Sequence, residues 1–378
     1  MSEPDCDIAI LGGGPAGCAL ALLLARAAPE PARIALLRAA PRPDEGSRAD
    51  PRVLALNHGS RVLLQSLQAW PQGAADIHTI HVSQRGRLGR TLIRREDFGV
   101  AQLGSVVRYG ELQGALHGQL AGSGIRVVQG PPAQVQEEDR RGATVRSGDT
   151  VLRCGVAVQA DGAPPADLRR EYGQHAVLAT AVASRPRAGW AWERFTREGP
   201  LALLPHPDGG GAHAVVWCCS PPRAASLASA DDETFSLALG AAFGDRLGTL
   251  RVRGDRHVFP LAMVLRRRGA GTRVVAIGNA AQTLHPVAGQ GLNLGLRDAA
   301  RLALALSPWL AQPAADPAGA LAGYAAARRP DRWVTAGLTD LLPRVFATGL
   351  PPVEHAAGLA LLALDLARPL RAPLAAAA

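Results

Sequence analysis

Three glycines near the amino terminus have the spacing that phosphate binding requires. Gly12, Gly14 and Gly17 form a G-x-G-x-x-G pattern directly after a short apolar run, residues 7–11. At this spacing the first glycine permits a tight turn, the second lets the backbone approach a pyrophosphate, and the third lets a helix pack closely on a strand. Free N–H groups at the start of that helix would face the negative charge. The spacing predicts a dinucleotide-binding site rather than a plain turn.

The residue at the position that usually binds a ribose hydroxyl cannot accept a hydrogen bond from it. An acidic residue is expected at the end of the second strand of such a unit, but Arg38 stands there. A guanidinium cannot accept a hydrogen bond. The ribose would have to be held in another way, for example by Asp44 or Glu45.

Two later segments also place polar residues after a buried strand. Asp161 follows one apolar run, and Gly278 and Asn279 follow another. The second segment continues into a glycine-rich turn that ends at Gly291 and then into a predicted helix, residues 292–306. A helix N-terminus preceded by glycines is a ready anion site, and in a flavoprotein it would stabilise charge on the reduced isoalloxazine.

A scaffold of parallel strands is needed to bring these segments together. Strand, helix and strand alternate at the amino terminus, which predicts the α/β class with a doubly wound sheet. From residue 176 the pattern changes to strand runs around one helix, residues 232–243, which predicts an inserted, mostly antiparallel sheet. The tail is predicted to be helical, with breaks at Pro343 and Pro351. The predicted boundaries are 1–75, 100–175 and 268–330 for the nucleotide-binding domain, 76–99 and 176–267 for the substrate domain, and 331–378 for the helical C-terminal region.

Composition, charge and cysteine spacing exclude several classes of protein. With 378 residues, 47% hydrophobic and 19% charged, the chain can bury a sizeable core and is not a disordered chain. The net charge of +9 comes only from scattered arginine, so coding bias explains it better than nucleic-acid binding does. Five cysteines without a C-x-x-C pair indicate neither a zinc site nor a disulfide framework.

Hydropathy and the amino terminus bear on location. The N-terminus lacks the basic flank of a signal peptide. No apolar run approaches the ~20 residues that span a bilayer. We expect a cytoplasmic protein, at most peripheral to the inner face of the membrane.

The motifs, in this order and with Arg52 between the first two, resemble the single-component FAD-dependent aromatic hydroxylases. Residues 191–205 and 278–286 are more closely similar to the 2-polyprenyl-6-methoxyphenol hydroxylases of ubiquinone biosynthesis. Asn279 and Gln282 stand where most relatives have Asp and His, and this branch shares the Asn and the Gln. The resemblance runs from about residue 6 to about residue 345.

The resemblance implies an FAD site built from residues of all three motifs. The glycines of the first motif would meet the pyrophosphate, and Arg52 would reach the same phosphates or the ribityl chain. Asn279 would bind near the ribityl or pyrophosphate region, and the later residues would lie along the isoalloxazine. Arg108 would replace an arginine that relatives carry slightly later. The implied cofactor-binding residues are Gly12, Gly14, Gly17, Arg52, Asp161, Gly278, Asn279, Pro286, Gly289, Gly291 and Asn293.

The resemblance also implies an activity. A monooxygenase of this kind would use NAD(P)H and O2, through a flavin C4a-hydroperoxide, to hydroxylate the ring of a polyprenylated methoxyphenol. FAD would supply the redox chemistry, so no catalytic side chain and no metal ligand is predicted. The single dinucleotide fingerprint implies that NAD(P)H binds transiently. A polyprenyl substrate implies contact with a membrane or with a quinone-biosynthesis complex.

Two other functions remain open. The departures at Arg38 and at Pro165, where relatives usually have serine, would fit a flavin-poor, non-catalytic subunit of a quinone-biosynthesis assembly. A flavin dehydrogenase or prenyl reductase on the same fold is the third interpretation. Retained FAD and incorporation of oxygen into product would separate the three.

Several further residues have both a structural and a functional interpretation, and we favour the structural one. His285 is expected to anchor its loop rather than to act near the flavin. Packing is favoured over redox chemistry, a substrate channel or a membrane surface for the following residues: Trp190, Trp192, Phe195, Trp217, Cys218, Cys219, Trp333, Leu338, Leu341 and Leu342.

Overall fold

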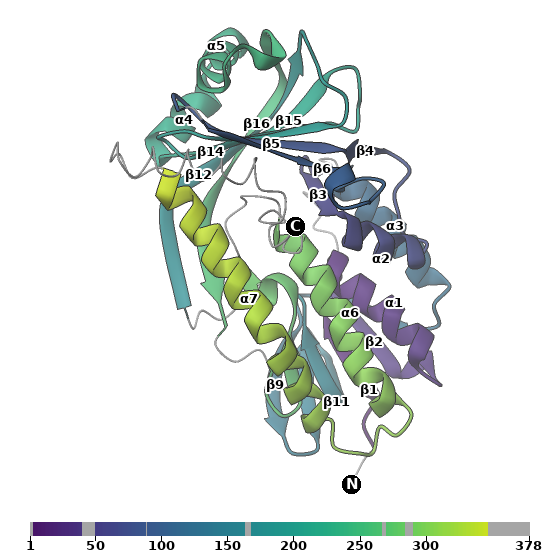
Figure 1. Ribbon diagram of the computed structural model, residues 1–378. Coiled ribbons are helices and arrows are strands. Elements are labelled where there is room, and N and C mark those ends of the chain that lie inside the picture. Colours follow the sequence, from purple (N-terminus) through teal and green to yellow (C-terminus); the bar gives the residue numbers. More distant parts are fainter. Residues whose placement is uncertain are drawn as a thin grey trace.

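A seven-stranded sheet forms the lower half of the molecule as drawn in Figure 1. The computed structural model describes residues 3–39, 50–87, 89–162, 168–266, 270–283 and 290–346. The sheet has the order β8-β2-β1-β11-β10-β9, and β17 pairs with β11. Its pairs are parallel except at β9–β10 and β10–β11. The strands are β1 (Cys6–Leu11), β2 (Ile34–Ala39), β8 (Arg126–Gly130), β9 (Gln134–Asp139), β10 (Gly142–Ser147), β11 (Thr150–Gln159) and β17 (Val274–Ala276).

Continuous apolar runs explain why the central strands of this sheet are covered on both faces. Every residue of β1 is buried, as expected for a parallel strand inside an α/β domain. Ile8 and Ile10 pack on the helical side, whereas Ala9 and Leu11 pack with residues of β10 and β11 on the other side. The helices on the first side are α1 (Pro15–Ala27), α3 (Tyr109–Ala121), α6 (Gln290–Leu310) and α7 (Ala318–Phe346).

A second, eight-stranded sheet lies above the first in Figure 1, with two helices over its outer face. Its order is β18-β16-β12-β15-β14-β13-β5-β6, and only the β5–β13 pair is parallel. Trp217 and Phe235 anchor the core between this sheet and the helices. The elements are β5 (Thr79–Gln84), β6 (Arg90–Arg94), β12 (Leu168–Ala183), β13 (Trp190–Phe195), β14 (Pro200–Pro205), β15 (Ala212–Cys219), α4 (Pro221–Ser229), α5 (Asp232–Phe243), β16 (Leu250–Leu265) and β18 (Gln282–Thr283).

A small sheet lies against the inner face of the eight-stranded sheet, the face opposite α4 and α5. Its order is β3-β7-β4, with antiparallel pairing throughout. Ile77 of β4 and Val106 of β7 share an apolar cluster with Ala191 of β13. The elements are β3 (Val53–Asn57), α2 (His58–Ser66), β4 (Ala74–Ile77) and β7 (Gly104–Arg108).

The predicted α/β class, with an inserted and mostly antiparallel sheet, is confirmed. Two local predictions are wrong. The inserted part contains α4 as well as the predicted helix, because Pro221 and Pro222 occupy the first helical positions, where proline is tolerated. The helix α7 runs from Ala318 through Pro343 to Phe346, so the predicted break at Pro343 is not present.

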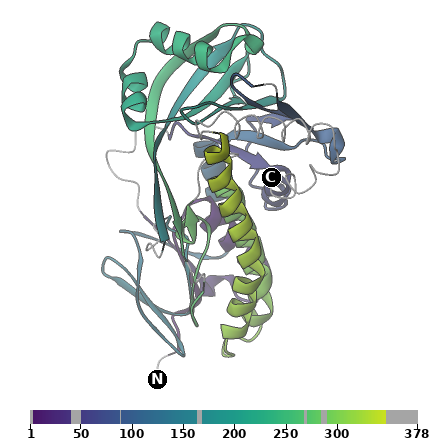
Figure 2. The ribbon, with the colours of Figure 1, turned by 60° about the vertical axis from the view of Figure 1, so that its left-hand side comes forward.

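Long strands connect the two large sheets. Figure 2 shows β12 reaching from the upper sheet to the lower half of the molecule. Leu168 of β12 pairs with Leu265 of β16, which in turn pairs with Gln282 of β18. The predicted domain boundary at 175/176 therefore falls inside β12. The division into domains stays a prediction.

Candidate functional site

The glycine-rich turn between β1 and α1 is shaped by close backbone approaches. Gly12 has a φ of +118°, and a Cβ there would lie 2.6 Å from the carbonyl of Ala160. A Cβ at Gly17 would lie 2.1 Å from the carbonyl oxygen of Gly12. A Cβ at Gly14, in contrast, would meet no atom of the residues that the structure describes within 4 Å. Among the described residues, the space beside Gly14 is therefore open and no side chain caps the helix start, and this arrangement suits an anion.

The three predicted motifs meet at the carboxyl ends of neighbouring strands. The Ala160 N–H donates to Leu11, and the Ile277 N–H donates to Gln159. These bonds bring the turn after β11 and the turn after β17 to the glycine-rich turn. Carboxyl ends of parallel strands are where α/β sheets bind ligands.

Residues of the second and third motifs lie beside one another at this edge. A Cβ at Gly162 would be 3.9 Å from the Cβ of Asn279, and a Cβ at Gly291 would be 3.8 Å from Asn279 Oδ1. Both Asp161 and Asn279 are exposed. The structure thus brings one carboxylate, one amide and the start of α6 to the same place.

The guanidinium of Arg52 contacts two other side chains, those of Asp50 and Tyr109. Its guanidinium forms a two-pronged ion pair with Asp50, with N–O distances of 2.6 to 3.0 Å. It also stacks on the ring of Tyr109, 4.6 Å from the centroid. Burial alone would raise the pKa of Asp50, but the hydrogen bonds from Arg52 outweigh it and hold that pKa below its usual value. Among the described residues, no hydrogen bond joins Arg52 to the glycine-rich turn.

Asn293 uses its side chain to connect three elements. Its Oδ1 accepts from the N–H of Asn57 at 2.9 Å and from the hydroxyl of Ser60 at 2.7 Å, and its Nδ2 donates to Ala55 at 3.0 Å. The amide therefore fixes β3 and α2 to the first turn of α6. Sequence reasoning assigned Asn293 to the isoalloxazine and did not anticipate these bonds.

Two residues of α3 that the sequence analysis did not single out contact the glycine-rich turn. Gln113 Nε2 donates to the carbonyl oxygen of Gly13 at 2.5 Å. His117 places Nε2 3.3 Å from the same oxygen and Nδ1 3.3 Å from the guanidinium of Arg38. Burial, reinforced by Arg38, lowers the pKa of His117 and favours a neutral ring. The spacing of Gln113 and His117 could have indicated this, since residues four apart lie on one face of a helix.

The third motif is held from behind by a buried ion pair. Arg328 of α7 donates to Asp298 of α6 at 2.7 Å, and both side chains are almost fully buried. The second oxygen of Asp298 accepts from the N–H of Gly278 at 3.1 Å. Arg328 also pairs with Asp331, which pairs with Arg297 at 3.0 Å. This network fixes the turn after β17 relative to both helices, and a carboxylate inside the predicted apolar helix was its sequence signal.

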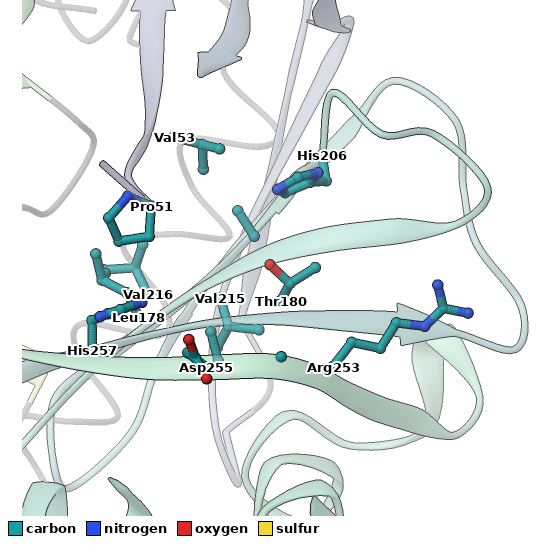
Figure 3. Close-up of a pocket in the computed structure, with 13 residues that line it drawn as sticks. Pro51, Val53, Leu178, Thr180, His206, Val215, Val216, Arg253, Asp255 and His257 are labelled. Atoms are coloured by element: carbon teal, nitrogen blue, oxygen red, sulfur yellow. The ribbon is translucent and has the colours of Figure 1, made fainter. Parts of the chain in front are cut away.

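A pocket of about 240 Å³ opens between the residues that precede and begin β3 and the inner face of the large sheet. Figure 3 shows Pro51 and Val53 on one side of it, with Leu178, Val216 and His257 on the sheet. Pro51, Val53, Leu178 and Val216 give the pocket apolar contacts, and His257 adds an imidazole. Arg253, Asp255 and His206 add polar groups. Burial, with Arg108 nearby, lowers the pKa of His206 and favours the neutral imidazole.

The structure also shows where several other residues interpreted from the sequence lie. Trp192 and Trp217 lie in the core beneath α4 and α5, as the packing interpretation expects. All five cysteines are free and buried, and burial raises the pKa of the Cys219 thiol to about 11. Trp333 is half exposed on α7. Other predicted residues lie outside the described residues: Asp44, Glu45, Pro165, His285, Pro286 and Gly289.

The described part of the chain shows neither a metal site nor a membrane-spanning helix. No cluster of three His, Cys, Asp or Glu side chains there could hold a metal ion. No helix within those same ranges combines the length and the hydropathy needed to cross a bilayer.

Comparisons with known proteins point to one family. The signature of the family described as "FAD binding domain" matches residues 139–336. The chain is 36% identical to the ubiquinone hydroxylase UbiL of Rhodospirillum rubrum over 240 residues, which are 61% of this chain and 55% of UbiL. It thus spans about half the length of that relative. It is 28% identical to the 3-demethoxyubiquinol 3-hydroxylase of Escherichia coli, over 97% of this chain and 96% of that protein.

The fold is similar to that of a solved enzyme structure. The crystal structure of P. aeruginosa PqsL in complex with 2-aminobenzoylacetate superposes with a TM-score of 0.75. The superposition covers 94% of this chain and 99% of PqsL at 22% identity. At that identity the likeness concerns the fold alone.

Proposed function

The chain belongs to the FAD binding domain family, and from that membership we propose that it is an FAD-dependent monooxygenase of ubiquinone biosynthesis. Its substrate is a polyprenylated methoxyphenol, which it hydroxylates on the ring. The predicted resemblance to flavin-dependent hydroxylases is confirmed by the family and by the named relatives. The predicted FAD cofactor is confirmed with it.

The residues present fit FAD. The open space at Gly14 and the uncapped start of α1 would receive the pyrophosphate. When bound, FAD supplies the redox chemistry that side chains lack, taking electrons from NAD(P)H and activating O2. We assign the cofactor site to the predicted set: Gly12, Gly14, Gly17, Arg52, Asp161, Gly278, Asn279, Pro286, Gly289, Gly291 and Asn293.

The protein's own part in the reaction is to bind, orient and exclude water. In the pocket between Pro51 and the inner face of the large sheet, Val53, Leu178 and Val216 offer apolar contacts to a phenol ring and its prenyl chain. Apolar walls keep water from the reacting groups. His206, whose lowered pKa favours the neutral imidazole, adds a polar group to the pocket.

The observation that carries this proposal is the convergence of three strand-end turns at one sheet edge, beside a helix start that no side chain caps. The inserted sheet, residues 76–99 and 176–267 in our division, serves as the substrate domain. Exposed Trp333 and Val334 on α7 support a peripheral contact with the inner face of the membrane or with a quinone-biosynthesis complex.

Oxygen labelling tests the activity. The purified protein, loaded with FAD, is given NAD(P)H, a short-chain prenylated methoxyphenol and isotopically labelled O2. We expect one labelled oxygen atom in the product by mass spectrometry. NAD(P)H-dependent reduction of substrate without label would favour a dehydrogenase or prenyl reductase. A colourless protein that cannot be reconstituted with FAD would favour the non-catalytic subunit.

A further inference from the structure

A continuous row of side chains crosses the inner face of the large sheet. Strand register pairs Glu193 of β13 with Ala202 of β14, and Ala202 with Val216 of β15. Val216 pairs with Leu178 of β12, and Leu178 with His257 of β16. Residues paired across neighbouring strands lie on the same face. The row therefore has an apolar middle and a titratable group at each end.

The orientation of Trp192, next to Glu193 in the chain, shows which face of the sheet carries this row. Trp192 packs edge-on against Phe243 of α5, with ring centroids 5.8 Å apart, so it points to the helix-covered side. Successive side chains of a strand point to opposite faces. Glu193 therefore points to the inner face, as does Ala191, which packs with residues of the small sheet.

The row extends from the pocket to Ala202 and Glu193, which lie beyond the pocket's lining. Val216, Leu178 and His257 all line the pocket. Glu193 stands two strands from Val216, a separation of about 10 Å at the usual strand spacing. A ring lying over Ala202 would thus have its polar end at Glu193 and the rest of the molecule in the pocket.

The Glu193 carboxylate has no hydrogen bond or ion pair with any residue that the structure describes. It is partly buried, and burial raises its pKa to about 7. Its register neighbours on β5 and β14, Val82 and Ala202, carry no charge. The titratable group that acts on it from β15 is the thiol of Cys218. An unpartnered carboxylate in apolar surroundings is costly unless a ligand supplies a donor.

We propose that Glu193 binds the ring hydroxyl of the substrate as its hydrogen-bond acceptor. The inference deepens the proposed function and rests on it, because the ligand is the phenol named there. A hydrogen bond to a carboxylate draws electron density onto the phenol oxygen and into the ring. It also selects molecules with a free hydroxyl at this position, since an analogue without one leaves the carboxylate unpaired.

Binding selectivity tests the inference. The probes are a short-chain prenylated methoxyphenol and the analogue in which hydrogen replaces the ring hydroxyl. Dissociation constants are measured on the FAD-loaded protein from the change in flavin absorbance. The phenol should bind about tenfold to a hundredfold more tightly than the deoxy analogue. This ratio of the two affinities is the size expected for a hydrogen bond to a charged group.

Variants at Glu193 should reduce that ratio in a graded way. Glu193→Gln keeps a neutral acceptor and should lose part of the ratio. Glu193→Met should lose nearly all of it, because the phenol loses its acceptor and the deoxy analogue no longer leaves a carboxylate unpaired. Glu193→Met replaces an unpaired carboxyl with an apolar chain, so its folding should not suffer. The matched control is Glu198→Gln on the exposed turn beyond β13, which should keep the full ratio.

The outcomes distinguish this inference from the proposed function. An unchanged ratio in both Glu193 variants overturns the role of Glu193, even if the wild type hydroxylates the phenol. Failure of the wild type to place labelled oxygen in the phenol overturns the proposed function instead, whatever the ratio. A ratio that falls in the order Glu, Gln, Met supports the inference.

Discussion

Gly17 faces the backbone of Gly12 so closely that a Cβ at residue 17 would stand 2.1 Å from the Gly12 carbonyl oxygen. A Cβ at Gly14 would have no described residue within 4 Å. The two glycines therefore serve different ends. Gly17 lets the protein pack, and Gly14 leaves room for something else.

Gly14→Val should leave the protein folded and abolish FAD binding, because the branched side chain would fill the space through which a pyrophosphate approaches the backbone. The measurement is flavin absorbance after desalting, together with the melting temperature of the flavin-free protein. Gly17→Ala is the comparison, and it should destabilise the fold by about 3 kcal/mol through overpacking. Stoichiometric FAD in Gly14→Val would contradict the assignment.

Arg38→Glu should tighten FAD by roughly 1 to 2 kcal/mol if a ribose hydroxyl lies within reach, since glutamate accepts the hydrogen bond that arginine cannot. Arg38 lies 3.3 Å from His117 and also donates to Gln129 when that amide is turned to face it. Titration with FAD measures the change, and Arg38→Gln controls for loss of charge alone. Equal or weaker affinity in Arg38→Glu would show that the chain holds the ribose by other groups.

Asp298→Asn should destabilise the protein by about 3 to 5 kcal/mol, because it leaves the guanidinium of Arg328 buried without its partner. Urea unfolding of the flavin-free protein measures this. Combining it with Arg328→Met should recover most of the loss, since removing both charges leaves neither unpaired. Asp331→Asn, at a more exposed site, should cost less. A double variant no more stable than Asp298→Asn would refute the account.

The stability of the protein should fall as pH rises from about 4.5 to about 7 because of Glu193. Burial raises the pKa of its carboxyl from 4.5 to about 7, so the folded state holds a proton that the unfolded state releases in this range. Glu193→Gln has no such group and should gain in melting temperature relative to wild type between pH 4.5 and pH 7.5. A constant difference between the two proteins across that range would count against the raised pKa.

Deleting the residues after Pro351 should leave FAD binding and NAD(P)H oxidation intact but lower hydroxylation of long-chain substrate far more than that of a short-chain analogue. Each CH2 favours an apolar environment by ~0.8 kcal/mol, so a polyprenyl chain must be taken up from a membrane or a partner. Trp333 and Val334, exposed on α7, precede this segment. Product formation on both substrates is measured, and equal losses would assign the tail to the core.

The glycine-rich turn could be predicted from local sequence, whereas contacts between distant parts of the chain could not. The roles of Gly12 and Gly17 as turn and packing residues follow from six residues and the strand before them. The pairing of Asp298 with Arg328 depends on how α6 packs on α7, which no short pattern records. Glu193 is similar, because its place on the inner face depends on strand register. Arg52 was assigned to a ligand, and its ion pair with Asp50 two residues away was overlooked.

The position of β17 has a consequence for folding during synthesis. This strand completes the centre of the seven-stranded sheet by pairing Ala157 with Val274, after every strand of the inserted sheet except β18 has been made. Contacts so distant in sequence form slowly and late. While the ribosome is still making the insert, β11 has an open edge, and open edges are prone to pair with other chains. The nascent chain must therefore avoid pairing with other chains, while its cofactor site is incomplete, until the last quarter of the sequence leaves the ribosome.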